Sequence, residues 1–114
     1  MNMAFSKTTE QIRNRTKTVT RRSIDTWRKL KPGDVLQAVA KAQGLKKGEH
    51  VERLATIRVV RINQCLLCEL STQDVAREGF RGMTPEQFIF DVYRANPATL
   101  VRRIEFEYVD EAPE

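Results

Sequence analysis

Residues Thr16 to Arg22 read TKTVTRR, a stretch in which β-branched residues are mixed with basic ones. Threonine and valine at neighbouring positions favour a β-strand, so we expect a strand that begins close to Thr18. Two functions fit this composition. The stretch could be a basic edge strand that grips phosphate, or a site where Lys17 activates a threonine hydroxyl for chemistry.

The segments on both sides of this strand also have clear local signals. A short helix is expected just before it, in residues 8–15 (TTEQIRNR), with Thr8 or Thr9 as its cap. After it, Pro32 and Gly33 predict a turn that leads into a strand at residues 34–40 (DVLQAVA). Residues 41–50 (KAQGLKKGEH) have the composition of an exposed loop, and residues 54–62 (LATIRVVRI) that of a strand.

The second half of the chain predicts two helices and a final strand. Ser71 or Thr72 can cap a helix that ends at Gly79, where glycine is favoured. Thr84 is followed by a proline and then by Gln87, which is a capping box, and this helix should run to the Asn96-Pro97 break. Residues 101–109 (VRRIEFEYV) alternate between apolar and charged side chains, which is typical of a half-buried strand.

Length and composition indicate one folded domain. The chain has 114 residues, of which 40% are hydrophobic and 31% charged, enough for one compact core. We therefore expect a single domain over residues 1–114, with a core at about residues 3–110 and an acidic tail at 110–114. Strands and short helices without a βαβ repeat predict the α+β class, with a curved or barrel-like sheet and helices at its rim.

Several function classes find no support in the sequence. No apolar run reaches the roughly 20 residues needed to cross a bilayer, so no membrane association and a cytoplasmic location are expected. Cys65 and Cys68 have the spacing of half a zinc site, but only His50 could add a further soft ligand. We expect no structural metal and no cofactor, and two buried or half-buried thiols. The oligomeric state stays open, with a monomer favoured.

Basic residues are concentrated in the N-terminal third. Residues 1–34 hold nine lysines and arginines against three acidic residues, a net charge of +6, whereas the whole chain carries +5. Such a concentration points to a polyanionic partner or substrate. The alternative is a solvated basic face that binds nothing.

The motifs, taken in order, resemble the ASCH domain family. A basic helix leads into K-T-x-T-x-R at Lys17–Arg22, which is followed by K-P-G-D-V-L at Lys31–Leu36, then by R-E-G and T-P-E-x-F. The likeness extends from about Ile12 to Tyr108. It implies a small β-barrel related to the PUA domains, whose members bind RNA or modified nucleobases, so RNA or a modified nucleoside is the expected partner.

The resemblance also implies a candidate reaction. One kind of ASCH protein is a small bacterial amidohydrolase that removes the acetyl group from 4-acetylcytidine with a lysine, a threonine and a glutamate. Matched motif by motif, these residues fall on Lys17, Thr20 and Glu78. Other ASCH proteins are RNA-binding modules or nucleases, so a non-catalytic binding module and a nuclease are the alternatives. This chain has Arg15 where the amidohydrolase pattern has a glycine, and the segment at residues 42–52 is longer.

Strand geometry sets a condition for this catalytic set. Side chains alternate along a strand, so Lys17 and Thr20 would point to opposite faces unless Lys17 lies on the turn before the strand. If they do meet, a desolvated and neutral Lys17 could activate the Thr20 hydroxyl, while Glu78 holds the lysine or carries a proton. The alternative is a surface lysine, a strand threonine and a helix-end glutamate that never meet.

Four further residues are candidates for binding the substrate or nucleic acid: Arg15, Arg21, Arg22 and Trp27. Alternation predicts that one of Arg21 and Arg22 faces the cleft and the other solvent; the resemblance selects Arg22 for the contact with a phosphate or carbonyl. A salt bridge of Arg22 with Asp34 or Glu78 is the alternative. Trp27 could stack on a base or pack in the core.

Phe80 and Met83 follow Glu78 closely in the sequence. They could line a pocket beside that glutamate or pack in the core.

Overall fold

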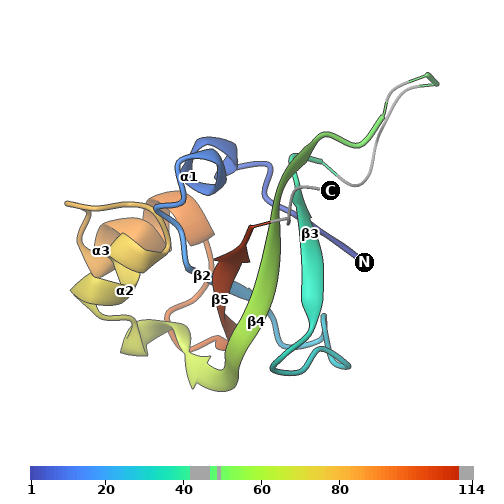
Figure 1. The fold of residues 1–114 in the computed structure, drawn as a ribbon. Helices are drawn as coiled ribbons and strands as arrows, with labels where there is room; N and C mark the ends of the chain where they lie inside the picture. The colour runs from blue at the N-terminus through green and yellow to red at the C-terminus, as the bar shows by residue number, and fades with distance from the viewer. Residues whose placement is uncertain (42–46, 49, 111–114) are drawn as a thin grey trace.

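The computed structural model describes residues 1–41, 47–48 and 50–110 as five strands with short helices beside them (Figure 1). The expected loop at 41–50 lies largely outside the described residues, as does the expected acidic tail after Asp110. The strands and helices are β1 (Asn2–Ala4), α1 (Thr9–Arg13), β2 (Val19–Ser23), β3 (Val35–Val39), β4 (Arg53–Leu66), η1 (Leu67–Glu69), α2 (Thr72–Arg77), α3 (Pro85–Gln87), η2 (Phe88–Tyr93) and β5 (Leu100–Val109).

The strands form one mixed sheet in the order β1-β3-β4-β5-β2. β1 runs parallel to β3, and the other neighbouring pairs are antiparallel. Irregular register in β3 at Ala38/Val39 and in β4 at Val59/Arg61 adds local twist, because bulges bend a strand. The α+β class and the strands at 19–23, 35–39, 53–66 and 100–109 confirm the sequence-based assignment.

Closure of the sheet into a barrel is not found. β1 and β2 are the two edges, and within the described residues no main-chain ladder joins them. A side chain bridges the edges instead: Arg22 Nη2 in β2 donates a hydrogen bond to the Ala4 carbonyl in β1 at 2.8 Å. The three-residue β1 has few main-chain groups to offer, and those on one of its two edges are paired with β3.

Two apolar clusters hold the fold together. The larger one lies on the sheet and includes Met3, Ile12, Leu36, Ile57 and Phe106. The smaller one packs beneath the helical segments on the other side of β2 and β5, and includes Leu67, Val75 and Phe88. The fold therefore has two separately packed apolar regions.

The helices α2 and α3 follow their capping signals, whereas α1 lacks the expected threonine cap, because Thr8 at its N-cap position makes no side-chain capping hydrogen bond and Thr9 Oγ1 donates to the Phe5 carbonyl. Ser71 Oγ accepts a hydrogen bond from the Asp74 amide and begins α2, and Gly79 follows this helix with a φ of +103°. Thr84 and Gln87 form the predicted capping box of α3. The chain then widens into the π-helical η2, and Arg94 ends it in the left-handed region at a φ of 59°. No helix in the described part of the chain has the length and apolar character to cross a membrane.

The cysteines differ from the prediction of two buried or half-buried thiols. Cys65 is half-buried near the end of β4, but Cys68 in η1 is exposed. The 3-10 turn rotates Cys68 away from the second cluster, while its neighbour Leu67 is fully buried there. Cysteine's apolar character does not decide burial on such a short turn.

Candidate functional site

A cavity of about 250 Å³ lies where β1 and β2 face each other without a ladder. Its walls come from the end of β1 and the following turn, from β2 and the turn before it, from the end of α2, and from η2. The lining residues are Ala4, Phe5, Ser6, Lys7, Thr8, Lys17, Thr20, Arg21, Arg22, Glu78, Phe80, Phe88, Val92 and Tyr93. Lys17, Thr20 and Glu78 thus line one cavity, and Arg21 and Arg22 line it with them.

Lys17 lies on the turn before β2, which begins at Val19, so strand alternation does not separate it from Thr20. The Lys17 carbonyl accepts a hydrogen bond from the Tyr108 hydroxyl at 2.5 Å, and the Thr18 amide donates to the Arg77 carbonyl at 2.7 Å. These bonds fix the turn against β5 and α2. The side chain points inward and is 4% exposed.

The Lys17 amine is bonded to Glu78 twice. Nζ lies 2.7 Å from the carboxylate Oε1 and 3.0 Å from the main-chain carbonyl of the same residue. Burial lowers the pKa of Lys17 below its ordinary value, and the Glu78 carboxylate opposes that change only in part. The amine is therefore easier to deprotonate than a surface lysine.

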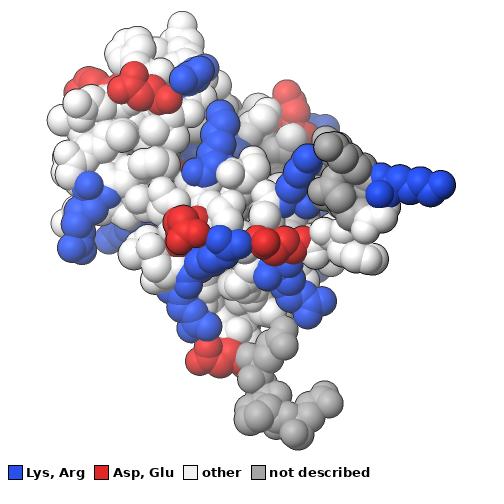
Figure 2. All heavy atoms as spheres, turned by 90° about the horizontal axis from the view of Figure 1, so that it is seen from above, with Lys and Arg blue, Asp and Glu red and all other residues white. Residues whose placement is uncertain are grey.

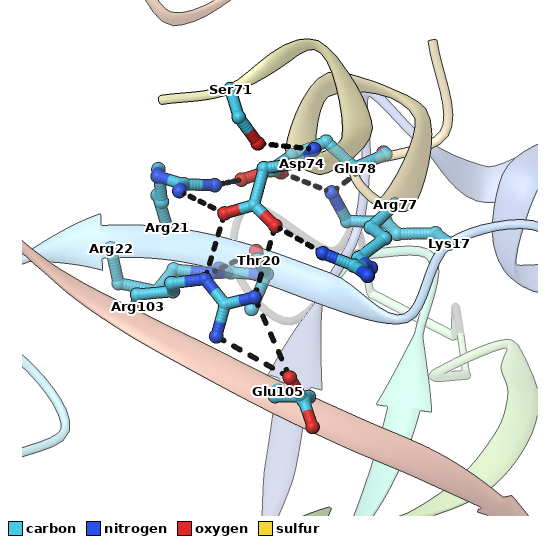
Figure 3. A network of polar contacts seen from close by, with 10 residues as sticks. All are labelled: Lys17, Thr20, Arg21, Arg22, Ser71, Asp74, Arg77, Glu78, Arg103 and Glu105. Atoms are coloured by element: carbon cyan, nitrogen blue, oxygen red, sulfur yellow. Dashed lines mark hydrogen bonds and ion pairs between the residues drawn. The ribbon is translucent and has the colours of Figure 1, made fainter. Parts of the chain in front are cut away.

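Glu78 is the C-cap residue of α2, directly before Gly79. Its second oxygen, Oε2, accepts a hydrogen bond from Arg21 Nη1 at 2.9 Å, so each carboxylate oxygen has its own cationic donor (Figure 3). A β-carbon on Gly79 would lie 2.6 Å from Gln11 Cγ, so glycine lets α1 approach closely here. The close packing of α1 against this turn fixes the position of Glu78.

Asp74 extends the ion pairs by one helical turn. It accepts from Arg21 Nη2 at 2.5 Å, from Arg103 Nε at 2.8 Å and from Arg77 Nη1 at 3.1 Å (Figure 3). The hydrogen bond from Arg103 and those from Arg21 and Arg77 hold the pKa of Asp74 well below its usual range. Arg21 is therefore held between two carboxylates.

Sequence reasoning overlooked Asp74 and Arg103. A signal was present: Asp74 and Glu78 stand four residues apart, which places both on the same face of a helix. Arg103 stands opposite Arg21 in the β2–β5 register, and this pairing depends on the tertiary fold.

Thr20 and Arg22 lie two residues apart on β2 and are hydrogen-bonded. Arg22 Nε donates to Thr20 Oγ1 at 3.1 Å, and the Arg22 guanidinium also lies over the Phe5 ring, 4.9 Å from its centroid. Thr20 itself is 4% exposed. A positive donor on the hydroxyl oxygen stabilises negative charge there, which favours loss of its proton.

Arg21 and Arg22 correct the expectation that one of them would face solvent. Arg21 is buried at 6% exposure and its guanidinium reaches α2, while Arg22 is half-buried and reaches β1. The two side chains do point to opposite faces of β2, as alternation predicts. Neither face is open to solvent there, because α2 lies on one side and β1 on the other. The predicted alternatives of an Arg22 salt bridge with Asp34 or Glu78 are not formed, since its hydrogen-bond partners are Thr20 and Ala4.

Four aromatic side chains also line the cavity: Phe5, Phe80, Phe88 and Tyr93. Phe80 and Phe88 pack edge to face, with ring centroids 5.6 Å apart. Burial raises the pKa of the Tyr93 phenol, which therefore keeps its proton at neutral pH. The cavity thus combines an apolar aromatic wall with a polar, charged one.

The other candidate binding residues lie elsewhere. Arg15 is paired with Asp110 at 2.9 Å and lies over the Tyr108 ring, outside the cavity. Trp27 is partly buried and packs against the larger apolar cluster. Met83 and Phe80 both pack against the smaller cluster, and Phe80 also lines the cavity.

Several basic residues of the N-terminal third are buried or paired with acidic residues. Lys17 and Arg21 are buried with acidic partners, Arg13 pairs with Glu10 and Glu52, and Arg15 pairs with Asp110. On the face shown in Figure 2, basic side chains are spread out and several have acidic neighbours. The charge that is concentrated in the sequence is partly used inside the fold. Within the described residues, no group of three or more potential metal ligands comes together.

Comparisons with known proteins show the fold. No family model matches the sequence, and no curated protein matches it. Among solved structures, the ASCH domain from Lactobacillus crispatus JV V101 matches with a TM-score of 0.66 and 12% identity, over 94% of this chain and 77% of that one. A protein from Enterococcus faecalis V583, assigned to DUF984, has a TM-score of 0.66 and 19% identity, over 92% of this chain and 68% of that one.

A third structure, the hypothetical protein PH0355, matches with a TM-score of 0.57 and 19% identity, over 96% of both chains. The three matches cover between 92% and 96% of this chain. The chain therefore has the fold of the ASCH domain.

Proposed function

We propose that the cavity binds one modified pyrimidine nucleoside and hydrolyses its N-acyl group, as in 4-acetylcytidine. The observation that carries this proposal is that Lys17, Thr20 and Glu78 line a single cavity in which the lysine is buried against the glutamate. Its volume of about 250 Å³ is below the roughly 300–1,000 Å³ of pockets for drug-sized ligands, which suits a single base. The resemblance of the K-T-x-T-x-R motif to the ASCH amidohydrolases supports the same reaction.

Thr20 is the nucleophile in this proposal. Neutral Lys17 takes the proton from the Thr20 hydroxyl, and the hydrogen bond from Arg22 Nε stabilises the charge that develops on Oγ1. Oγ1 attacks the acyl carbon, and the bond between that carbon and the exocyclic nitrogen then breaks. The proton held by Lys17 passes to the leaving amine, which departs as cytidine.

Water completes the turnover by cleaving the acyl-threonine ester. Its proton returns to the Thr20 oxygen and acetate leaves, so the sum is one nucleoside amide and one water giving an amine and an acid. The pyrimidine ring withdraws electrons from the exocyclic nitrogen, so this nitrogen is a better leaving group than the nitrogen of a peptide amide. A lysine and a threonine can therefore suffice as proton carrier and nucleophile.

Glu78 holds Lys17 in place throughout this sequence. Its Oε1 and main-chain carbonyl position Nζ, and its Oε2 is kept in place by Arg21. When Lys17 carries the Thr20 proton, the adjacent carboxylate stabilises the ammonium form. The glutamate thus supplies orientation and electrostatic support to the proton transfer.

The test is chromatography of 4-acetylcytidine after incubation with the wild type, with Thr20→Val and with Thr18→Val. Valine matches threonine in shape, and Thr18 lines a groove outside the candidate cavity, so Thr18→Val is the matched control. We expect cytidine from the wild type and from Thr18→Val, and at least a 10²-fold loss in Thr20→Val. Absence of cytidine with all three proteins, or equal amounts with all three, contradicts the proposal.

Binding without turnover is the second candidate function. It is favoured by the two hydrogen bonds that Lys17 Nζ donates to Glu78, because they stabilise the protonated amine, which cannot accept the Thr20 proton. Calorimetry with 4-acetylcytidine distinguishes hydrolysis from binding alone. Heat of binding without release of cytidine would support the binding module. A steep decrease in the affinity for RNA between two salt concentrations would instead indicate a polymer as ligand.

A further inference from the structure

Thr8 occupies the N-cap position of α1 but does not cap it. Its side chain makes no capping hydrogen bond, and within the described residues its hydroxyl has no other partner. The residue is only 7% exposed and lines the cavity. Among buried side-chain atoms of the described residues, only Arg21 Nε lacks a partner, so the Thr8 hydroxyl oxygen keeps some accessible surface.

Two further polar groups in the cavity are free in the same way. Arg22 uses Nε and Nη2 on Thr20 and Ala4, but Nη1 has no partner within the described residues. The Tyr93 hydroxyl likewise makes no hydrogen bond there. Neither is among the fully buried atoms that lack a partner, so both keep some accessible surface, and both residues line the cavity.

These three groups come from three separate segments and share one chemical property. A guanidinium nitrogen can only donate hydrogen bonds, and a protonated phenol and a threonine hydroxyl both donate readily. Within the described residues, the positive charge of Arg22 is also without a carboxylate partner at hydrogen-bond distance, since its partners there are a hydroxyl and a carbonyl. Donors combined with a positive charge select a ligand atom that accepts hydrogen bonds and is rich in electrons.

We propose that Thr8, Tyr93 and Arg22 recognise the carbonyl oxygen at position 2 of a pyrimidine ring, so that the cavity selects 2-oxopyrimidines over analogues without a strong acceptor at that position. This inference rests on the proposed function, because it assumes that a pyrimidine enters the cavity. It adds Thr8 and Tyr93 as specificity-determining residues, distinct from Lys17, Thr20 and Glu78. The aromatic wall of the cavity receives the ring, and these donors set which ring is accepted.

The expected difference in affinity between the two kinds of ring follows from the free-energy cost of leaving hydrogen-bond donors unpaired. A ring with sulfur in place of the oxygen keeps its shape and connectivity but accepts hydrogen bonds only weakly. The desolvated donors then lose their partner, an effect that is typically larger than the gain from a single extra contact. Removing the donor from the protein should therefore abolish the preference for oxygen.

The experiment is an NMR titration of the ¹⁵N-labelled protein with cytidine and with 2-thiocytidine, neither of which carries an acyl group to be hydrolysed. We expect the wild type to bind cytidine about tenfold more tightly than 2-thiocytidine, the size of one hydrogen bond, with shifts in the amides of Thr8 and Thr20. In Thr8→Val and in Tyr93→Phe the ratio should fall toward one. Thr18→Val should keep the wild-type ratio.

Two outcomes overturn the inference and are distinguishable. Equal binding of the two nucleosides by the wild type and all variants shows that the donors do not select the ring, while the proposed binding of pyrimidines stands. Absence of shifts with either nucleoside shows that no pyrimidine enters the cavity, which removes the proposed function as well. If cytidine binds selectively but 4-acetylcytidine is not hydrolysed, the recognition stands and only the catalytic step fails.

Discussion

Lys17 Nζ lies 2.7 Å from Glu78 Oε1 although 61 residues separate the two in the sequence. Both side chains are almost completely buried, at 4% and 3% exposure. A buried ion pair is held by its geometry, because each charge has lost its hydration and removal of either partner leaves the other unpaired. The pair therefore ties the turn before β2 to the end of α2 and makes the cavity sensitive to proton binding.

The stability of the protein should depend on pH through Lys17. Its pKa in the folded state is lowered from the ordinary 10.5, so between the folded value and 10.5 the unfolded chain binds this proton more tightly. The free energy of unfolding then rises with pH in that window. We expect urea denaturation of the wild type to show this rise relative to Lys17→Met, which cannot bind the proton.

Tyr108 has the opposite effect on the pH dependence of stability, and it does so at higher pH. Burial raises its pKa to about 12, so stability falls as pH rises above the ordinary value of 10. Both proteins contain Tyr108, and the difference between them isolates Lys17. Parallel pH profiles for the two proteins would contradict the lowered pKa of Lys17.

Replacing Asp74 should be far more costly than replacing its most exposed partner. Asp74→Asn leaves Arg21 and Arg103 without this carboxylate in a buried setting, which should lower the free energy of unfolding by about 3–5 kcal/mol. Arg77 is 48% exposed, so Arg77→Ala should cost less than about 1 kcal/mol. Denaturant titrations measure both. Equal effects would show that the buried network does not stabilise the fold.

Loss of the Glu78 charge should reduce turnover more than it reduces folding. Glu78→Gln keeps the size of the side chain but removes the carboxylate that holds Lys17 and stabilises its ammonium form. We expect at least a 10²-fold slower release of cytidine from 4-acetylcytidine. Glu86→Gln removes an equivalent charge from the exposed first turn of α3 and should leave the rate unchanged. A normal rate in Glu78→Gln would remove Glu78 from the mechanism.

Gly79 should be essential for the position of Glu78. In Gly79→Ala the backbone would be strained at a φ of +103°, and the new β-carbon would meet Gln11 at 2.6 Å. Gly82 has a φ of +91° but open space around it, so Gly82→Ala has the strain without the clash. We expect Gly82→Ala to lower the melting temperature, by strain of about 1–3 kcal/mol, and Gly79→Ala to lower it further. Similar melting temperatures would show that α1 moves aside.

Features set by neighbouring residues were predictable from the sequence. The strand at Val19–Ser23, the capping box at Thr84 and the alternation in β5 each depend on residues within a few positions of one another. The ASCH fold was also within reach, because its motifs occur in a recognisable order. These signals are local, and tertiary packing reinforces them here.

Features that depend on distant contacts were not predictable. β1 has only three residues and no alternating pattern, and it is a strand because β3 offers it a parallel edge. The side chains of Arg21 and Arg22 both point into the fold, because Arg21 finds its partner on α2 and Arg22 finds its partner on β1. The charge of the N-terminal third likewise gave no hint of its partners, such as Asp110 for Arg15, 95 positions away. Net charge alone therefore overstated the basic surface.

The bridge from Arg22 to Ala4 gives one wall of the cavity a weak attachment. Within the described residues, separating β1 from β2 breaks one guanidinium–carbonyl hydrogen bond and no main-chain pair between these strands. Such an edge belongs to the regions that unfold locally at low free energy, and amide hydrogen exchange measures this opening. Met3 and Ala4 should exchange faster than the amides of β5, and a ligand that holds Arg22 in place should slow them. Exchange at β1 would then report occupancy of the cavity even for a ligand that is never turned over.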